Sequence, residues 1–274
     1  MTIILFWRMG VVRTIIKYGL IVGAFFISGA KGWGQSYPTE RQWSSPALWM
    51  TVGGEKVIDS TQQVVVELST RSFTPYSHFS AFPASLFHLQ AAYQRSLTKR
   101  WRIGGKSRWR QRVMNTTWHN GVFIVHEGKI ASLTLLKEAH YEWVYWKERP
   151  TQSYGRFIGS MAAQKSFLWR DKPMMHELKA ELFIHHKDQY ATYRKIDQAR
   201  LGYTLYYDLP KVRLGVSLAT NNRYSFALGS IRPVYDEEGN IALGENGEEL
   251  YEEIPDRNIN AIQPYVGVSM QWNL

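Results

Sequence analysis

The chain has 274 residues, of which 45% are hydrophobic and 14% aromatic, and its formal charge is +10. It holds no cysteine, which fits any cellular compartment because disulfides are optional. It contains no P-loop, dinucleotide-binding fingerprint, zinc-ligand spacing or nucleophile elbow, so no motif supports the enzyme classes that those patterns mark. One all-β domain can occupy a chain of this length.

Residues 1–34 have the features of a secretory signal peptide. A basic front precedes a short apolar core from Tyr18 to Ile27, and the small residues Gly32 and Gly34 precede a cleavage position at Gln35. This core is too short to cross a bilayer of about 30 Å as a helix, and an uncleaved N-terminal anchor is the alternative. Cleavage would remove four basic and no acidic residues, which lowers the formal charge from +10 to +6.

The rest of the chain contains segments in which apolar and polar residues alternate, the pattern of strands with one apolar face. The first two, Ala47–Ile58 and Gln62–Arg71, flank a turn near Asp59. The segment from Trp101 to Val113 carries five cations on its polar face, and on a helix these residues would scatter around the axis. The five cations are Arg102, Lys106, Arg108, Arg110 and Arg112.

Later segments add carboxylates to the polar face. Within Ile130–Trp146, His140 stands between two glutamates at a spacing of two, so the three side chains share a face of the strand. That arrangement could hold a metal ion or an acid–base pair, and the alternative is a hydrogen-bonded histidine inside a barrel. The acidic and histidine positions are Glu138, His140, Glu142, Glu177 and Glu181.

The last segment, Tyr265 to Leu274, alternates without interruption. Val266, Val268 and Met270 share its apolar face, and polar or small residues occupy the other. Because earlier strands repeat this pattern with charges on the polar face, we expect lipid outside and a polar lumen inside. The predicted fold is therefore all-β, an antiparallel up-and-down transmembrane β-barrel.

The connections between the strands alternate between short and long along the chain, as in membrane barrels with short periplasmic turns and long outer loops. The short turns are predicted at Leu97–Arg100, Gly128, Arg170–Pro173 and Asp208–Lys211. Counting from Gln62 gives about ten strands, and Ala47–Val57 is then left over, either as an eleventh segment in the mouth or as part of a twelve-strand barrel. The predicted domains are the signal peptide, 1–34, and one barrel, 35–274. The long stretch 226–260 carries nine acids and two bases. We expect a solvated outer loop there, and calcium binding is the alternative.

The signal, the alternating strands and the apolar last strand with Trp272 resemble small, porin-like outer-membrane β-barrels of diderm bacteria. The resemblance covers roughly residues 47–274 and carries no catalytic motif. It implies a location in the cell outer membrane, with contacts to outer-membrane lipids and lipopolysaccharide and to the barrel-assembly machinery, and a partner protein at the outer loops. Such barrels often end in phenylalanine, whereas Leu274 stands at that position here.

Three functions fit these patterns. The first is a structural barrel or a narrow solute pore in which the cations favour anions, or in which they pair with the glutamates and largely fill the lumen. The second is an outer-membrane enzyme using residues such as His78 and His119, which lack diagnostic spacing. The third is a soluble exported barrel that binds a ligand. We predict no cofactor, and export makes nucleic acid an unsuitable partner for the basic strand.

Overall fold

The computed structural model describes residues 39–73, 84–112, 115–186, 196–227, 230–236, 238, 240–244, 248–255 and 257–274. These residues belong to one compact unit, Thr39–Leu274. The predicted signal peptide and His78 lie outside the described residues.

Almost all of the regular structure in this part of the chain is β-strand, joined by one turn of 3-10 helix, η1 (Pro150–Gln152). No helix in it is both long and apolar enough to cross a membrane. The strands are β1 (Thr39–Trp43), β2 (Ala47–Val57), β3 (Gln62–Phe73), β4 (Ala84–Ser96), β5 (Trp101–Arg112), β6 (Thr116–Ile130), β7 (Leu133–Trp146), β8 (Tyr154–Trp169), β9 (Lys172–His186), β10 (Ile196–Asp208), β11 (Val212–Ala227), β12 (Ser230–Pro233), β13 (Tyr251–Ile254) and β14 (Arg257–Asn273).

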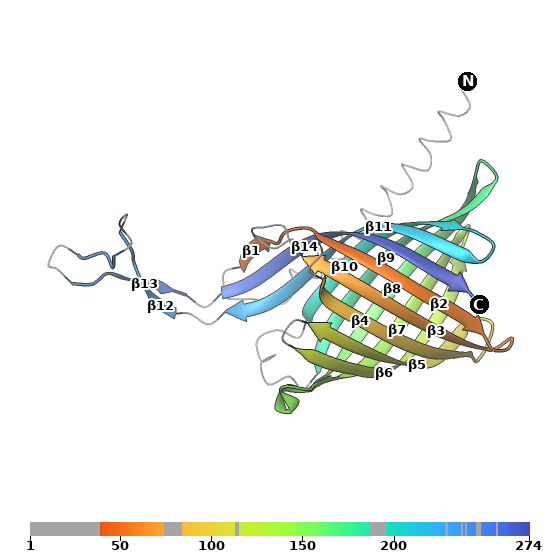
Figure 1. Ribbon diagram of the computed structural model, residues 1–274, viewed down its shortest axis with the longest axis horizontal. Coiled ribbons are helices and arrows are strands. Elements are labelled where there is room, and N and C mark those ends of the chain that lie inside the picture. The colour runs from red at the N-terminus through yellow and green to blue at the C-terminus, as the bar shows by residue number, and fades with distance from the viewer. Residues whose placement is uncertain are drawn as a thin grey trace, which may run out of the picture. The chain divides into compact units, whose positions relative to one another are not determined.

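Strands β2 to β11 pair with their neighbours in chain order, and β14 pairs with β11 on one side and with β2 on the other (Figure 1). The sheet therefore closes on itself into a barrel whose wall has eleven strands. This confirms the predicted all-β barrel of about ten strands. The ten strands counted from Gln62 are all present, and the segment left over, Ala47–Val57, is the eleventh wall strand.

The closing pair departs from the predicted antiparallel arrangement. With an odd number of strands the first and last wall strands run in the same direction, and β2 pairs with β14 in parallel, from Ala47 opposite Tyr265 to Glu55 opposite Asn273. The short strand β1 pairs in parallel with the start of the same edge of β14, from Thr39 opposite Asn258. Alternation alone predicts the facing of a strand, but it does not identify the strand's partner.

The edge of β14 that closes the barrel, which we call the closing seam, pairs first with β1 and then with β2, and the pairing is interrupted between them. Along β14 the pairing passes from Ile262, opposite β1, to Tyr265, opposite β2. Between these points Pro264 has no backbone N–H to donate. The side-chain amide of Gln263 bridges the interruption by donating to the Ser45 carbonyl at 3.2 Å.

The side chains that point out of the barrel wall, which we call the outward row, are mostly apolar. Val266 and Val268 lie on it, 44% and 42% exposed, as the alternation predicted. Ten wall strands in the described chain carry large exposed apolar side chains on this row. They include Met50, Val52, Val66, Leu68, Phe87, Leu89, Trp101, Ile103, Trp118, Val122, Ile124, Trp143, Phe157, Met161, Ile196, Leu214, Val216, Leu218, Val266 and Val268.

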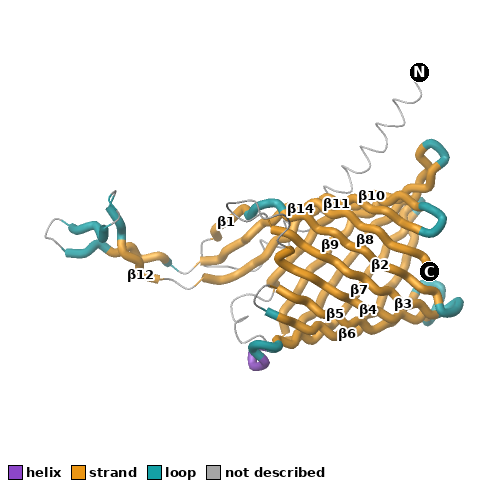
Figure 2. Tube along the Cα trace, in the orientation of Figure 1, coloured by secondary structure: helices purple, strands orange, loops and turns teal. Residues whose placement is uncertain are grey.

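The short connections lie at one end of the barrel wall (Figure 2). Asp59 organises the first of them, because its carboxylate accepts the Thr61 and Gln62 backbone N–H groups at 2.7 and 2.9 Å. These hydrogen bonds, the one from Thr61 first, lower the pKa of Asp59. The predicted turn at Arg170 is present, with positive φ angles of 50° and 60° at Arg170 and Asp171, as tight hairpin turns require.

One predicted connection is wrong. Gly128, predicted as a turn, pairs with Leu135 inside the hairpin of β6 and β7, and the turn lies at Ala131, whose φ is 53°. The pairing register of these long strands overrides the local turn signal of the glycine. The stretch 226–260, for which we expect an outer loop, contains in its described part the end of β11, the hairpin β12–β13 and the start of β14.

Candidate functional site: the charged lumen

The candidate site is the inner face of the barrel wall, where the predicted cationic strand lies. Arg108 donates from Nε to Gln90 Oε1 at 3.0 Å, and Lys106 Nζ lies 3.2 Å from Glu138 Oε1. Arg102 lies nearer the end with the short connections, 3.9 Å from Glu127. The β5 cations therefore use only one of the four glutamates, Glu138, as an ion-pair partner among the described residues.

The other predicted glutamates take partners that the sequence analysis did not name as site residues. Glu142 pairs with Arg156 on β8, and Glu181 pairs with Lys179 at 3.0 Å and with Arg200 of β10 at 3.4 Å. Glu177 accepts hydrogen bonds instead, from Gln164 at 2.6 Å and from Tyr206 at 3.4 Å. Arg156 and Arg200 stand on polar rows of their own strands, so the same alternation could have identified them.

Glu142 is the centre of the most buried group, with 1% of its surface exposed. Its Oε1 accepts from Arg156 and lies 3.1 Å from His119 Nδ1. His119 Nε2 lies 3.0 Å from the Thr117 hydroxyl oxygen. We name these four residues the Glu142 network. A carboxylate this deeply buried requires such partners, because removing a charge from water is costly unless hydrogen bonds and an opposite charge compensate it.

The hydroxyl, imidazole and carboxylate of this network follow the order used in nucleophilic catalysis. However, Thr117 and His119 are only 5% and 2% exposed, so a substrate cannot approach the hydroxyl in this structure. Arg156 also forms an ion pair with the Glu142 carboxylate, the group that would orient the histidine. The geometry therefore supports a packing role for these residues within the lumen.

Gly121 provides the space for this packing. It lies opposite Glu142 on β6, and a Cβ built there would come within 2.4 Å of both His140 Nε2 and the Tyr141 carbonyl oxygen. We expect Gly121→Ala to lower the free energy of unfolding by about 1–3 kcal/mol, the usual cost of overpacking. Urea titration of the folded form, followed by heat-modifiable gel migration, measures this.

Gly159 on β8 is the matched control, because a Cβ there meets no atom within 4 Å. Gly159→Ala should leave the urea midpoint within the scatter of the wild type. Equal losses in the two variants would mean that chain flexibility, and not crowding at His140, accounts for the effect.

Side chains from four strands meet at the indole of Trp49 on the inner face of the wall. The Arg71 and Arg200 guanidinium carbons lie 5.4 and 5.5 Å from the ring centroid, within the range of cation–π attraction. Tyr265 packs against the same indole with ring centroids 5.1 Å apart. Trp49 comes from β2 and Arg200 from β10, three strands away round the wall, so these side chains extend into the lumen at this level.

Arg110 and Arg112 share one feature with Arg108. In the part of the chain that the structure describes, none of the three has a carboxylate within ion-pair distance. Arg110 is instead repelled by Arg112 and by Arg156, Arg200 and Arg223. Positive charge thus exceeds negative charge on this side of the lumen.

Several buried polar atoms nearby can donate but have no partner among the described residues. They are Nε of Arg110, Nδ2 of Asn221 and Nε2 of His88. His88 lies opposite Arg110 on β4, and Asn221, with none of its surface exposed, accepts from Arg200 at 3.3 Å. Unpaired donors beside unpaired cations suit a ligand that only accepts hydrogen bonds, which is the chemistry of an oxyanion.

His140 does not have the geometry of a metal or acid–base site. Its Nε2 lies 4.0 Å from Glu142 Oε2, beyond hydrogen-bond distance, and neither ring nitrogen has a hydrogen-bond partner in the described chain. Its ring packs edge-on against Phe123, with centroids 6.5 Å apart. Across the described residues no group of three or more histidine, aspartate or glutamate side chains could hold a metal ion.

Some of the acidic stretch 226–260 is also described. Asp236 accepts the backbone N–H groups of Glu238 and Asn240 at 3.0 and 2.8 Å, which is the geometry of a turn. Tyr251 donates its hydroxyl to Glu249 at 2.5 Å. These carboxylates are therefore engaged within their own hairpin.

No protein-family model matches this sequence, and no curated protein matches it. Among solved structures, the chain is similar to one described as the NanC porin in a rhombohedral crystal form. The identity is 12% and the TM-score 0.41, over 81% of this chain and 91% of the porin chain.

The strand pairing itself defines the class of protein. The chain is a closed β-barrel of eleven wall strands, with an apolar outward row and charged side chains on its inward row.

Proposed function

We propose that this chain is an outer-membrane β-barrel, exported by its N-terminal signal, whose charged and largely filled lumen admits small anions. The observation that carries the membrane location is the outward row of large apolar side chains, which are between 37% and 63% exposed on ten wall strands of the described chain. Soluble proteins rarely expose contiguous apolar surface of this extent. Hydrocarbon is the solvent that such a surface fits, and a closed barrel leaves no unpaired sheet edge within it.

The same observation disfavours a soluble ligand-binding barrel. A barrel of that kind keeps its apolar row inside and its polar row in water. Here the reverse holds, since Glu142 and Arg156 face inward and are 1% and 5% exposed, whereas Leu218 faces outward and is 61% exposed.

The preference for anions rests on Arg110 and Arg112. Their charges are not balanced by any carboxylate in the described chain, and the unpaired donors beside them suit an acceptor-only solute. Charged rings inside a pore select ions of the opposite sign. Because side chains fill much of the lumen near Trp49, the solute must be small.

Two experiments test the proposal. Membrane fractionation and heat-modifiable gel migration of the full chain should place it, folded, in the outer-membrane fraction. A protein that stayed soluble without detergent would contradict the membrane location.

Conductance in planar bilayers tests the anion preference. Under a potassium chloride gradient, we expect the wild-type reversal potential to indicate chloride selectivity, and the double variant Arg110→Gln, Arg112→Gln to shift it toward the nonselective value. Lys137→Gln is the control, since this exposed lysine lies outside the lumen on β7. Cation selectivity in the wild type, or the same shift in the control, would overturn the anion preference and leave the barrel assignment standing.

A further inference from the structure

The charges on the inner face of the wall are distributed unevenly along the barrel axis. We define the level of a residue as its position in its strand, counted from the end that adjoins a short connection. In strands β2 to β11, the described inward residues at levels one to six include six carboxylates and four cations. The carboxylates are Glu55, Glu67, Glu127, Glu138, Glu177 and Asp208, and the cations are Arg102, Lys106, Lys129 and Arg213.

The remaining levels of the same strands carry the opposite excess. Their inward residues, in the part of the chain that the structure describes, include eight cations and two carboxylates. The cations are Arg71, Arg108, Arg110, Arg112, Arg156, Lys179, Arg200 and Arg223, and the carboxylates are Glu142 and Glu181. The formal charge of these described side chains therefore changes from −2 near the short connections to +6 nearer the long ones.

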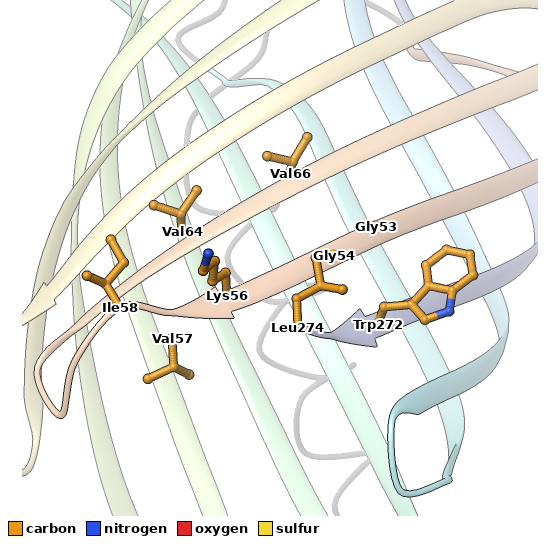
Figure 3. Close-up of a pocket in the computed structure, with 9 residues that line it drawn as sticks. All are labelled: Gly53, Gly54, Lys56, Val57, Ile58, Val64, Val66, Trp272 and Leu274. Carbon is orange, nitrogen blue, oxygen red and sulfur yellow. The ribbon is translucent and has the colours of Figure 1, made fainter.

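Side chains on the other face of the same strands do not contribute to this distribution. Lys56 lines a depression on the outer side of the wall together with Val64 and Val66 (Figure 3). Glu67, which follows Val66 in β3, points the other way and accepts a hydrogen bond from the Gln90 side-chain amide at 3.0 Å. The uneven distribution is therefore a property of the charges that face the lumen.

The two ends of the lumen are too far apart for their charges to cancel. Glu177 stands at level six of β9, and Arg112 stands at level twelve of β5. This difference corresponds to roughly 20 Å along a strand, at about 3.3 Å per residue, whereas salt screens charges over about 8 Å. The described short connections hold four cations and two carboxylates, which at most neutralise their end of the lumen. The end nearer the long connections therefore remains the more positive one.

From this distribution we propose that the lumen rectifies ion flow, and that it passes anions more readily when they enter from the end with the long connections. This inference rests on the proposed function, because it requires a path for small anions. Anions drawn in through the cationic end accumulate in the lumen, and cations that arrive from the other end are stopped there, so salt concentrates inside. The opposite voltage draws both ions out. The conductance is therefore larger when the compartment at the short connections is positive.

Current–voltage measurements on single barrels of the full chain in planar bilayers test this. In about 0.1 M potassium chloride, where the Debye length is about 10 Å, we expect about twice as much current at this polarity as at the opposite one. In about 1 M salt the Debye length is about 3 Å, and the two currents should become equal.

The orientation of each barrel is established with Leu209→Cys, since the chain has no cysteine of its own and Leu209 lies in a short connection. A maleimide-linked polyethylene glycol should obstruct the lumen, and lower the conductance, only when it is added on the side of that connection.

A charge-conserving variant tests whether the distribution of charge is the cause. It removes two cations near the long connections, through Arg110→Gln and Arg112→Gln. It restores them near the short connections, through Gln94→Arg at level three of β4 and Gln164→Arg at level six of β8. Gln164 lies opposite Glu177 and donates to it at 2.6 Å, so an arginine there has a partner. The variant should stay selective for chloride and lose most of the rectification.

Lys137→Gln, which removes an exposed lysine from the outer side of β7, is the control and should rectify as the wild type does. Equal currents at the two polarities in a chloride-selective wild type would overturn the inference, as would a larger current at the opposite polarity. Rectification that persisted in the charge-conserving variant would also overturn it, since the shape of the lumen would then be the cause. The salt dependence of the wild type makes the same distinction without a variant. Cation selectivity, or no conductance, would instead be a failure of the proposed function.

Discussion

Replacing Glu142 with leucine should lower the free energy of unfolding by about 3–5 kcal/mol, the cost of removing one partner from a buried ion pair. The variant leaves the Arg156 guanidinium without its carboxylate and leaves His119 Nδ1 without its 3.1 Å partner. Both groups are buried, so water cannot replace the lost contacts without opening the lumen. Urea titration followed by heat-modifiable gel migration measures the change.

The double variant Glu142→Leu, Arg156→Leu separates the ion pair from simple packing. Because it removes both charges, it should recover part of the loss. Glu127→Gln is the control, since Glu127 is more exposed and lies 3.9 Å from Arg102, and exposed pairs contribute only about 0–1 kcal/mol. If Glu142→Leu were as mild as Glu127→Gln, the Glu142 network would not be a stabilising element of the lumen.

Placing an arginine at Leu218 should oppose insertion into a bilayer by about 2–4 kcal/mol, the cost of a cation on the lipid face of a barrel near the midplane. Leu218 lies on the outward row of β11, is 61% exposed, and is flanked by Val266 and Tyr203 on the neighbouring strands. The measurement is the folded fraction, by gel migration, after refolding into lipid vesicles over a range of urea concentrations.

Two controls make the result specific to position and charge. Leu218→Ile keeps an apolar side chain and should insert as the wild type does. Leu209→Arg adds the same charge in the short connection between β10 and β11, where water and head groups can solvate it, and should cost little. If Leu218→Arg inserted normally, the outward row would not be in contact with hydrocarbon, and the proposed membrane location would be wrong.

The candidate site was predictable in part. The polar rows of β5, β7 and β9 identified Arg108, Glu142 and Glu181 as inward-facing residues, because side-chain direction in a strand follows from parity along the chain. The ion pairs were not predictable, since they depend on the pairing register of neighbouring strands, which places Arg156 opposite Glu142 and Arg200 opposite Glu181. Glu142 pairs with Arg156, and Glu181 with Lys179 and Arg200, so most of the β5 cations have no glutamate partner among the described residues.

The sequence by itself determined the class of fold, the facing of the strands and the opposition of an apolar row to a charged one. These depend on the alternation of apolar and polar residues with a period of two, which is visible in the sequence itself. The tertiary structure alone decided that Ala47–Val57 closes the wall and that the closing pair is parallel. These are contacts between residues more than 200 positions apart, and local alternation carries no information about which distant strands form hydrogen bonds with each other.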